Sequence, residues 1–129
     1  ELRIGSSLRR TIDRGIASDR IVLAGFSQGG AVAYQTALTC MYPLAGLLCL
    51  STYFATGDTI TPNSANRHIP VRICHGARDP MVPVRQGQLA RERLTAMGYA
   101  VEYSEYPMEH AVCPEEIADI SQWLQRVLG

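Results

Sequence analysis

The chain alternates short apolar runs with stretches of helical character, and this alternation constrains its fold more than any other feature. The runs are short and continuous, as expected of strands that are buried on both faces of a sheet. The last of them alternates in part between apolar and polar residues, which is typical of a strand nearer an edge. Strands that alternate with helices of this length predict a parallel sheet covered by helices, an α/β fold. The predicted strands are residues 20–25, 45–51, 71–74 and 100–106.

Helices are expected before, between and after these strands. Leu8, Ile12 and Ile16 recur at helical spacing, so the first segment is predicted to be an amphipathic helix. Pro114 suits the first turn of the last helix, and the two glutamates that follow it favour the positive end of the helix dipole. The other predicted helices are residues 29–41 and 83–97, and the last one is 114–128.

Length and charge narrow the class of protein. The 129 residues suit one domain, and their formal net charge of zero gives no electrostatic reason to expect a nucleic acid or an anionic membrane as partner. No apolar run approaches the length of a membrane span. Because the chain opens at Glu1 without an initiator methionine, we expect its true N-terminus to lie upstream.

The four cysteines are widely and irregularly spaced, unlike a disulfide scaffold or a paired zinc motif. We interpret them as reduced thiols, which predicts a cytoplasmic protein. A zinc site built from His110, Cys113, Cys74 and His75 is an alternative, but the set lacks regular ligand pairs, so no metal is expected. The cysteines are Cys40, Cys49, Cys74 and Cys113.

Ser27 lies in a G-x-S-x-G motif, Gly25-Phe26-Ser27-Gln28-Gly29, that directly follows one predicted strand and directly precedes a predicted helix. Strand, tight turn and helix form the setting in which such a serine becomes an exposed nucleophile. The turn requires neighbours without bulk, which Gly25, Gly29 and Gly30 are expected to supply. The backbone N–H of Gln28 would then point to where an oxyanion forms. A glycine-rich phosphate-binding turn is the alternative interpretation.

A nucleophilic serine needs a base, and the base needs an orienting acid. His110 lies in a loop between the last strand and the last helix, where it can reach Ser27, so we predict that it is the base. Asp79 directly follows the third strand, and Asp58 lies in the long loop of residues 52–69. We prefer Asp79 as the acid because sites of parallel sheets form at the carboxyl ends of the strands. Of the remaining histidines, His68 is expected to be a solvated loop residue, and His75 is expected to have a structural or supporting role.

With these motifs the chain resembles the carboxylesterase and acyl-protein thioesterase family of α/β-hydrolases, and the bacterial carboxylesterase branch is the nearest. Four stretches carry the resemblance: RIVLAGFSQGGAVA, GLLCLSTY, IPVRICHGARDPMVP and EYPMEHAVCPEEIADISQWL. It implies that Ser27 is the nucleophile, Asp79 the acid and His110 the base, with Gln28 as one oxyanion donor. The implied activity is hydrolysis of short or medium acyl esters or thioesters, without a cofactor.

The resemblance also implies that residues 1–129 form only the C-terminal part of the domain. Members of the family have further N-terminal strands and a His-Gly turn that supplies a second oxyanion donor. Without them the first strand, 20–25, would have a bare edge that could pair with the missing segment or with a second copy. A non-catalytic fragment that binds another chain through this edge is the alternative function.

The substrate pocket is expected around Met81 and Val82 and along the loop 52–69, from their position in the fold. Glu109 departs from the family, which usually has glycine before this histidine. Its side chain is expected to crowd the acyl pocket and to alter the rate and the pH optimum.

Overall fold

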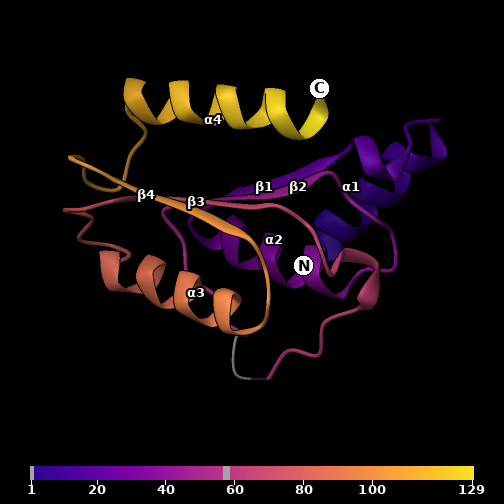
Figure 1. The fold of residues 1–129 in the computed structure, drawn as a ribbon, viewed down its shortest axis with the longest axis horizontal. Coiled ribbons are helices and arrows are strands. Elements are labelled where there is room, and N and C mark those ends of the chain that lie inside the picture. The colour runs from indigo at the N-terminus through magenta and orange to yellow at the C-terminus, as the bar shows by residue number, and fades with distance from the viewer. Residues whose placement is uncertain (1, 57–58) are drawn as a thin grey trace.

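The computed structural model describes residues 2–56 and 59–129 of the chain. A four-stranded parallel sheet runs in the order β1-β2-β3-β4 and is flanked by helices, as the sequence predicts. Figure 1 shows α2 and α3 below the sheet and α4 alone above it. The elements are α1 (Leu2–Asp13), β1 (Val22–Phe26), α2 (Gln28–Thr39), β2 (Gly46–Leu50), β3 (Val71–Gly76), α3 (Val84–Ala96), β4 (Val101–Tyr106) and α4 (Pro114–Leu128), with 3-10 turns at Ser18–Arg20 and Ser64–Asn66.

The main core lies between the sheet and the helices α1, α2 and α3. Along β2 and β3, alternate side chains such as Leu47 and Ile73 point to this side and are almost fully buried. The intervening side chains point to α4, where Trp123 packs so closely on Gly46 that a side chain there would collide with the indole ring. Both faces of the central strands are therefore covered, which explains their continuous apolar runs.

Several predicted boundaries differ from the structure by one or two residues, and two differences near the start of the chain have a clear local cause. Ile16 lies beyond α1 and is 48% exposed, because the helix ends at Asp13 and Gly15 adopts a left-handed φ of 98°. The first strand begins at Val22, two residues later than predicted, because Ser18–Arg20 form a 3-10 turn. β4 is an edge strand, as its alternating pattern indicated, and β1 is the other edge of the described sheet.

All four cysteines are free thiols, as predicted. Cys49 and Cys74 are buried in the sheet, and burial raises the pKa of the Cys74 thiol to about 11. Within residues 2–56 and 59–129, no helix combines the length and the apolar character that crossing a membrane requires.

Candidate active site

Ser27 occupies a strained turn between the end of β1 and the start of α2. Its φ of 56° and ψ of −123° are unusual for a residue with a side chain, and such strain persists only where the surroundings enforce it. The Ser27 N–H donates to the Leu50 carbonyl at 3.0 Å, and the Thr52 hydroxyl donates to the Ser27 carbonyl. Leu50 is the last residue of β2 and Thr52 follows it by two residues, so the end of the neighbouring strand and the segment after it fix the turn in this conformation.

Two of the three predicted glycines are required by close packing. A Cβ at Gly25 would collide with the carbonyl of Gly29, and a Cβ at Gly30 would collide with the Thr52 side chain. Gly29 is different, because a Cβ there would meet nothing within 4 Å. The prediction that Gly29 must lack bulk is therefore wrong: its Cα faces open space, and only its carbonyl packs on Gly25.

These contacts make the two glycines a matched pair for mutation. Gly25→Ala is expected to lower the free energy of unfolding by about 1–3 kcal/mol, because the obstructing atoms are backbone atoms that cannot rotate away. Gly29→Ala is expected to be neutral or to stabilise by up to about 1 kcal/mol, because alanine favours the helical first turn. Urea unfolding of both variants measures the difference, and equal stabilities would contradict the packing described here.

Asp79 lies three residues beyond the end of β3, and its side chain is fully buried. One carboxylate oxygen, Oδ1, accepts hydrogen bonds from the N–H groups of Met81 and Val82, both at 2.9 Å. Burial raises the pKa of Asp79, but the hydrogen bonds from the Val82 N–H, the His110 ring and the Met81 N–H outweigh it and hold that pKa below its ordinary value. The carboxylate is therefore ionised at neutral pH.

His110 lies in the loop between β4 and α4, and its ring joins the other two side chains. Nδ1 lies 2.6 Å from Asp79 Oδ2, and Nε2 lies 3.1 Å from Ser27 Oγ. Because the ionised carboxylate can only accept, Nδ1 carries the hydrogen and Nε2 is free to accept the hydroxyl proton of Ser27. The structure thus brings together three residues that the sequence separates by 31 and 83 positions.

The loop that carries His110 is anchored to the end of β3. The Arg78 N–H donates to the Met108 carbonyl at 3.1 Å. A side chain at Gly76 would collide with the carbonyls of Met108 and Glu109, so this approach depends on glycine. The ring of Phe26 also packs on the imidazole of His110, with centroids 4.7 Å apart. Backbone contacts and one aromatic ring together restrain the position of the imidazole.

The other predicted residues have different positions around this site. Met81 is 73% exposed beside Asp79, whereas the Val82 side chain is buried. Glu109 is exposed, and Gln28 begins α2, so its backbone N–H belongs to the first turn, which has no partner within the helix. His68 is exposed, as expected, and the alternative acid Asp58 lies outside the described residues.

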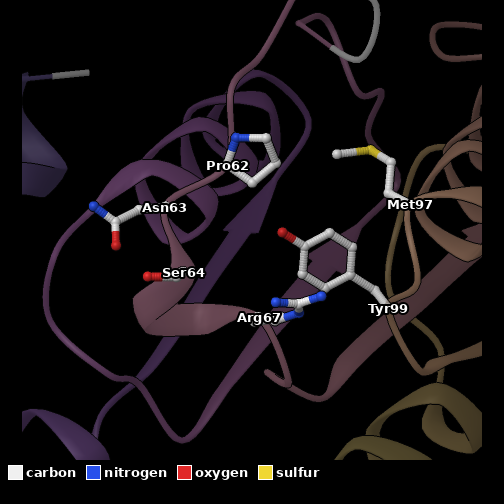
Figure 2. A pocket seen from close by; sticks show the side chains of 6 residues that line it. All are labelled: Pro62, Asn63, Ser64, Arg67, Met97 and Tyr99. Carbon is white, nitrogen blue, oxygen red and sulfur yellow. The ribbon is translucent and has the colours of Figure 1, made fainter.

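A hollow of about 260 Å³ lies at the opposite edge of the sheet, where β3 and β4 begin (Figure 2). Most of its lining comes from the second half of the loop 52–69, which must return the chain from the end of β2 to the start of β3. The prediction that this loop lines the substrate pocket is therefore wrong for residues 62–67. Among the loop residues that the structure describes, Thr52 at the start donates a hydrogen bond to the Ser27 carbonyl. The lining residues are Pro62, Asn63, Ser64, Arg67, Met97 and Tyr99.

Two contacts of the site were not predicted from the sequence, the hydroxyl of Thr52 on the Ser27 carbonyl and the ring of Phe26 on His110. Thr52 directly follows the second predicted strand, so its place at the carboxyl edge was an available signal. Phe26 occupies a variable position of the G-x-S-x-G motif, which accepts many residue types, so the sequence did not indicate its contact with His110.

Comparison with known proteins places this geometry in a family. Residues 3–128 match the model of the phospholipase/carboxylesterase family. Acyl-protein thioesterase 1 of Gibberella zeae is 41% identical over 126 residues, which are 94% of this chain and 54% of that protein. The homologous proteins of Neurospora crassa and Aspergillus fumigatus are 38% and 35% identical. The chain spans about half the length of these curated relatives.

Solved structures show the same fold. The crystal structure of Arabidopsis thaliana SOBER1 superimposes with a TM-score of 0.87 at 26% identity, over 98% of this chain and 62% of that one. Zea mays acyl-protein thioesterase 2 gives a TM-score of 0.83 at 27% identity, over 96% of this chain and 63% of that one. The parallel sheet is therefore that of an α/β-hydrolase, and the chain belongs to the phospholipase/carboxylesterase family.

Proposed function

We propose that this chain carries the catalytic residues of a serine hydrolase that cleaves short- to medium-chain carboxylic esters or thioesters. Ser27 is the nucleophile, His110 the general base and Asp79 the orienting acid. The observation that carries the proposal is the imidazole of His110, which lies within hydrogen-bond distance of both the Ser27 hydroxyl and the Asp79 carboxylate. Nucleophile, base and orienting acid in this order form the arrangement that activates a serine hydroxyl.

The reaction proceeds in two acyl transfers. Ser27 Oγ attacks the ester carbonyl while Nε2 of His110 takes its proton, and the Asp79 carboxylate stabilises the imidazolium that forms. His110 then returns the proton to the leaving alcohol or thiol, which departs and leaves Ser27 acylated. Water attacks the acyl-enzyme by the same sequence and releases the acid. Every step uses groups of this chain, so the proposal requires no cofactor.

The developing oxyanion is stabilised at the start of α2. The Gln28 N–H belongs to the first turn of α2, where it has no partner within the helix, and the positive end of the helix dipole adds to its effect. A second donor is expected from the His-Gly turn in the N-terminal half of the family domain. The loss of one oxyanion donor typically lowers kcat by about a hundred- to a thousandfold. Residues 1–129 alone are therefore expected to be a slow enzyme.

The acyl chain is placed against the apolar surface beside the turn that carries Asp79. Met81 is 73% exposed there, and the adjacent Val82 side chain is buried. Glu109 is exposed and precedes His110 directly in the sequence, so its negative charge is expected to disfavour anionic substrates. These positions favour an uncharged acyl group, and the similar proteins named acyl-protein thioesterases favour a thioester among the substrates.

A panel of p-nitrophenyl esters of increasing acyl length, acyl-CoA thioesters and peptides tests this function. Turnover is expected for the short and medium esters or the thioesters and to be absent for the peptides. The Ser27→Ala variant sets the background. No turnover above that background by a folded chain would contradict the proposal.

The second candidate is a non-catalytic chain that pairs with another chain through β1. It is favoured by the position of β1 at an edge of the described sheet and by the exposure of Phe26, 39%, on that strand. This function predicts a folded, inactive protein that forms dimers or binds a chain corresponding to the N-terminal half of the family domain. Ala24→Lys places a charge on the exposed strand and is then expected to yield monomers in analytical ultracentrifugation.

A further inference from the structure

His75 is a buried polar side chain that the proposed reaction does not use. It lies at the end of β3, and none of its surface is exposed. Nε2 lies 2.7 Å from the carbonyl oxygen of Val82. A carbonyl oxygen can only accept, so Nε2 carries the hydrogen and donates it. Nδ1 has no hydrogen-bond partner among the described residues. Burying an imidazole that makes only one hydrogen bond costs free energy, so we expect that bond to have a role in the structure.

The position of this ring is fixed from the opposite side by α3. A Cβ at Gly87 would lie 2.7 Å from Nδ1 of His75, so the helix presses its backbone against the imidazole. With β3 on one side and α3 on the other, the Nε2–H can point in only one direction. That direction is towards the turn formed by residues 79–82.

The same turn holds the carboxylate of Asp79. The N–H groups of Met81 and Val82 donate to Oδ1, and the other oxygen, Oδ2, accepts from His110. The bond from His75 to the Val82 carbonyl therefore anchors the residue whose own N–H donates to this carboxylate. His75 Nε2 also lies 3.9 Å from Oδ2, which is too far for a hydrogen bond.

We propose that His75 is a positioning residue for this site: its Nε2–H holds the turn of residues 79–82 and thereby aims the Asp79 carboxylate at His110. The inference rests on the proposed function for its effect on rate, but its geometric part concerns Asp79 and His110 alone. A misplacement of about 1 Å at a catalytic group can cost a hundredfold in rate. Loss of this hydrogen bond is therefore expected to lower kcat and to leave substrate binding unchanged.

Two amide variants test the hydrogen bond at nearly constant polarity. In His75→Gln the side-chain amide nitrogen can take the place of Nε2 and donate to the Val82 carbonyl. In His75→Asn it reaches only the place of Nδ1, where it faces Gly87. We expect His75→Asn to lower kcat about 10- to 100-fold with KM unchanged, and His75→Gln to stay close to wild type.

A spectroscopic readout separates positioning from general packing. The Nδ1 proton of His110, in a 2.6 Å hydrogen bond to Asp79, is expected to give a far-downfield line in the proton NMR spectrum. That line should persist in His75→Gln and should broaden or move upfield in His75→Asn. A merely structural role would reduce the folded fraction in thermal unfolding without moving the line of the molecules that remain folded.

Gly87→Ala offers a second perturbation that keeps the imidazole. Its Cβ would displace the ring of His75, so the same loss of kcat and of the downfield line is expected. If His75→Asn does not fold, the comparison of Gly87→Ala with His75→Gln tests the inference instead. A wild-type kcat and an unchanged line in His75→Asn, or a His75→Gln as impaired as His75→Asn, would overturn the inference. If the wild type shows no turnover above Ser27→Ala, the proposed function fails, while the NMR line still tests the positioning of Asp79.

Discussion

Replacing Ser27 with alanine is expected to lower kcat for ester hydrolysis by on the order of 10⁴- to 10⁶-fold, with little change in stability. The alanine variant keeps the turn, the Gln28 N–H and the substrate surface, but it has no atom that can form the acyl-enzyme. Only the weak catalysis by the remaining groups survives. Steady-state hydrolysis of a p-nitrophenyl ester, with thermal unfolding alongside, measures both quantities.

Ser121→Ala is the matched control for this experiment. Ser121 is exposed on α4, away from the carboxyl edge of the sheet, so its loss should leave kcat unchanged. A Ser27→Ala variant that folds and keeps more than a few per cent of wild-type turnover would show that another group is the nucleophile.

Asp79→Asn is expected to lower kcat by about 10⁴-fold, although asparagine is nearly the same size as aspartate. The physical reason is the tautomer of His110. A carboxylate accepts from Nδ1 and leaves Nε2 unprotonated, whereas an amide NH₂ donates to Nδ1 and leaves the hydrogen on Nε2, which then cannot accept the proton of Ser27. The pH profile of kcat at saturating substrate measures this effect.

Asp19→Asn is the control for the loss of a negative charge, because Asp19 is exposed. The double variant Ser27→Ala/Asp79→Asn provides a sharper check, because residues that act as a unit have non-additive effects. It should be no slower than Ser27→Ala. Additive losses would mean that Asp79 acts independently of the serine, contrary to the geometry described above.

Much of the fold and of the site could be predicted because the responsible residues act locally. The run before Gly25 and the alanine-rich stretch after Gly30 specify a buried strand and a helix, and the motif between them specifies a tight turn. That Asp79 and His110 lie close to Ser27 could be predicted because both follow strands, and parallel strands bring their carboxyl ends to one edge. Topology alone therefore sufficed to gather these residues.

What could not be predicted depends on contacts between segments that are distant in sequence. The hydroxyl of Thr52 reaches the Ser27 carbonyl because two neighbouring strands end side by side, and the sequence indicates only that Thr52 lies at the carboxyl edge. The bond from His75 to the Val82 carbonyl spans only seven residues, but it depends on how the turn after β3 folds back on that strand. The prediction that the loop 52–69 lines the substrate pocket failed for residues 62–67, because the composition indicates a loop but not the edge of the sheet that the loop approaches. Whether a glycine is needed for space, as at Gly25 but not Gly29, likewise depends on the packed structure.

The assignment of the bacterial carboxylesterase branch and of a cytoplasmic location remain predictions. The similar curated proteins cited above are fungal, and the plant structures share the fold at 26–27% identity.

Covalent labelling by a fluorophosphonate probe, with the modified peptide identified by mass spectrometry, tests the activation of Ser27 most directly. The probe reacts only where a base has made a serine hydroxyl nucleophilic, and it needs no particular acyl group. We expect a single phosphonyl group on Ser27 and a strongly reduced labelling rate in His110→Ala. A folded protein that is not labelled, is labelled at another residue, or is labelled equally fast in His110→Ala would contradict the account.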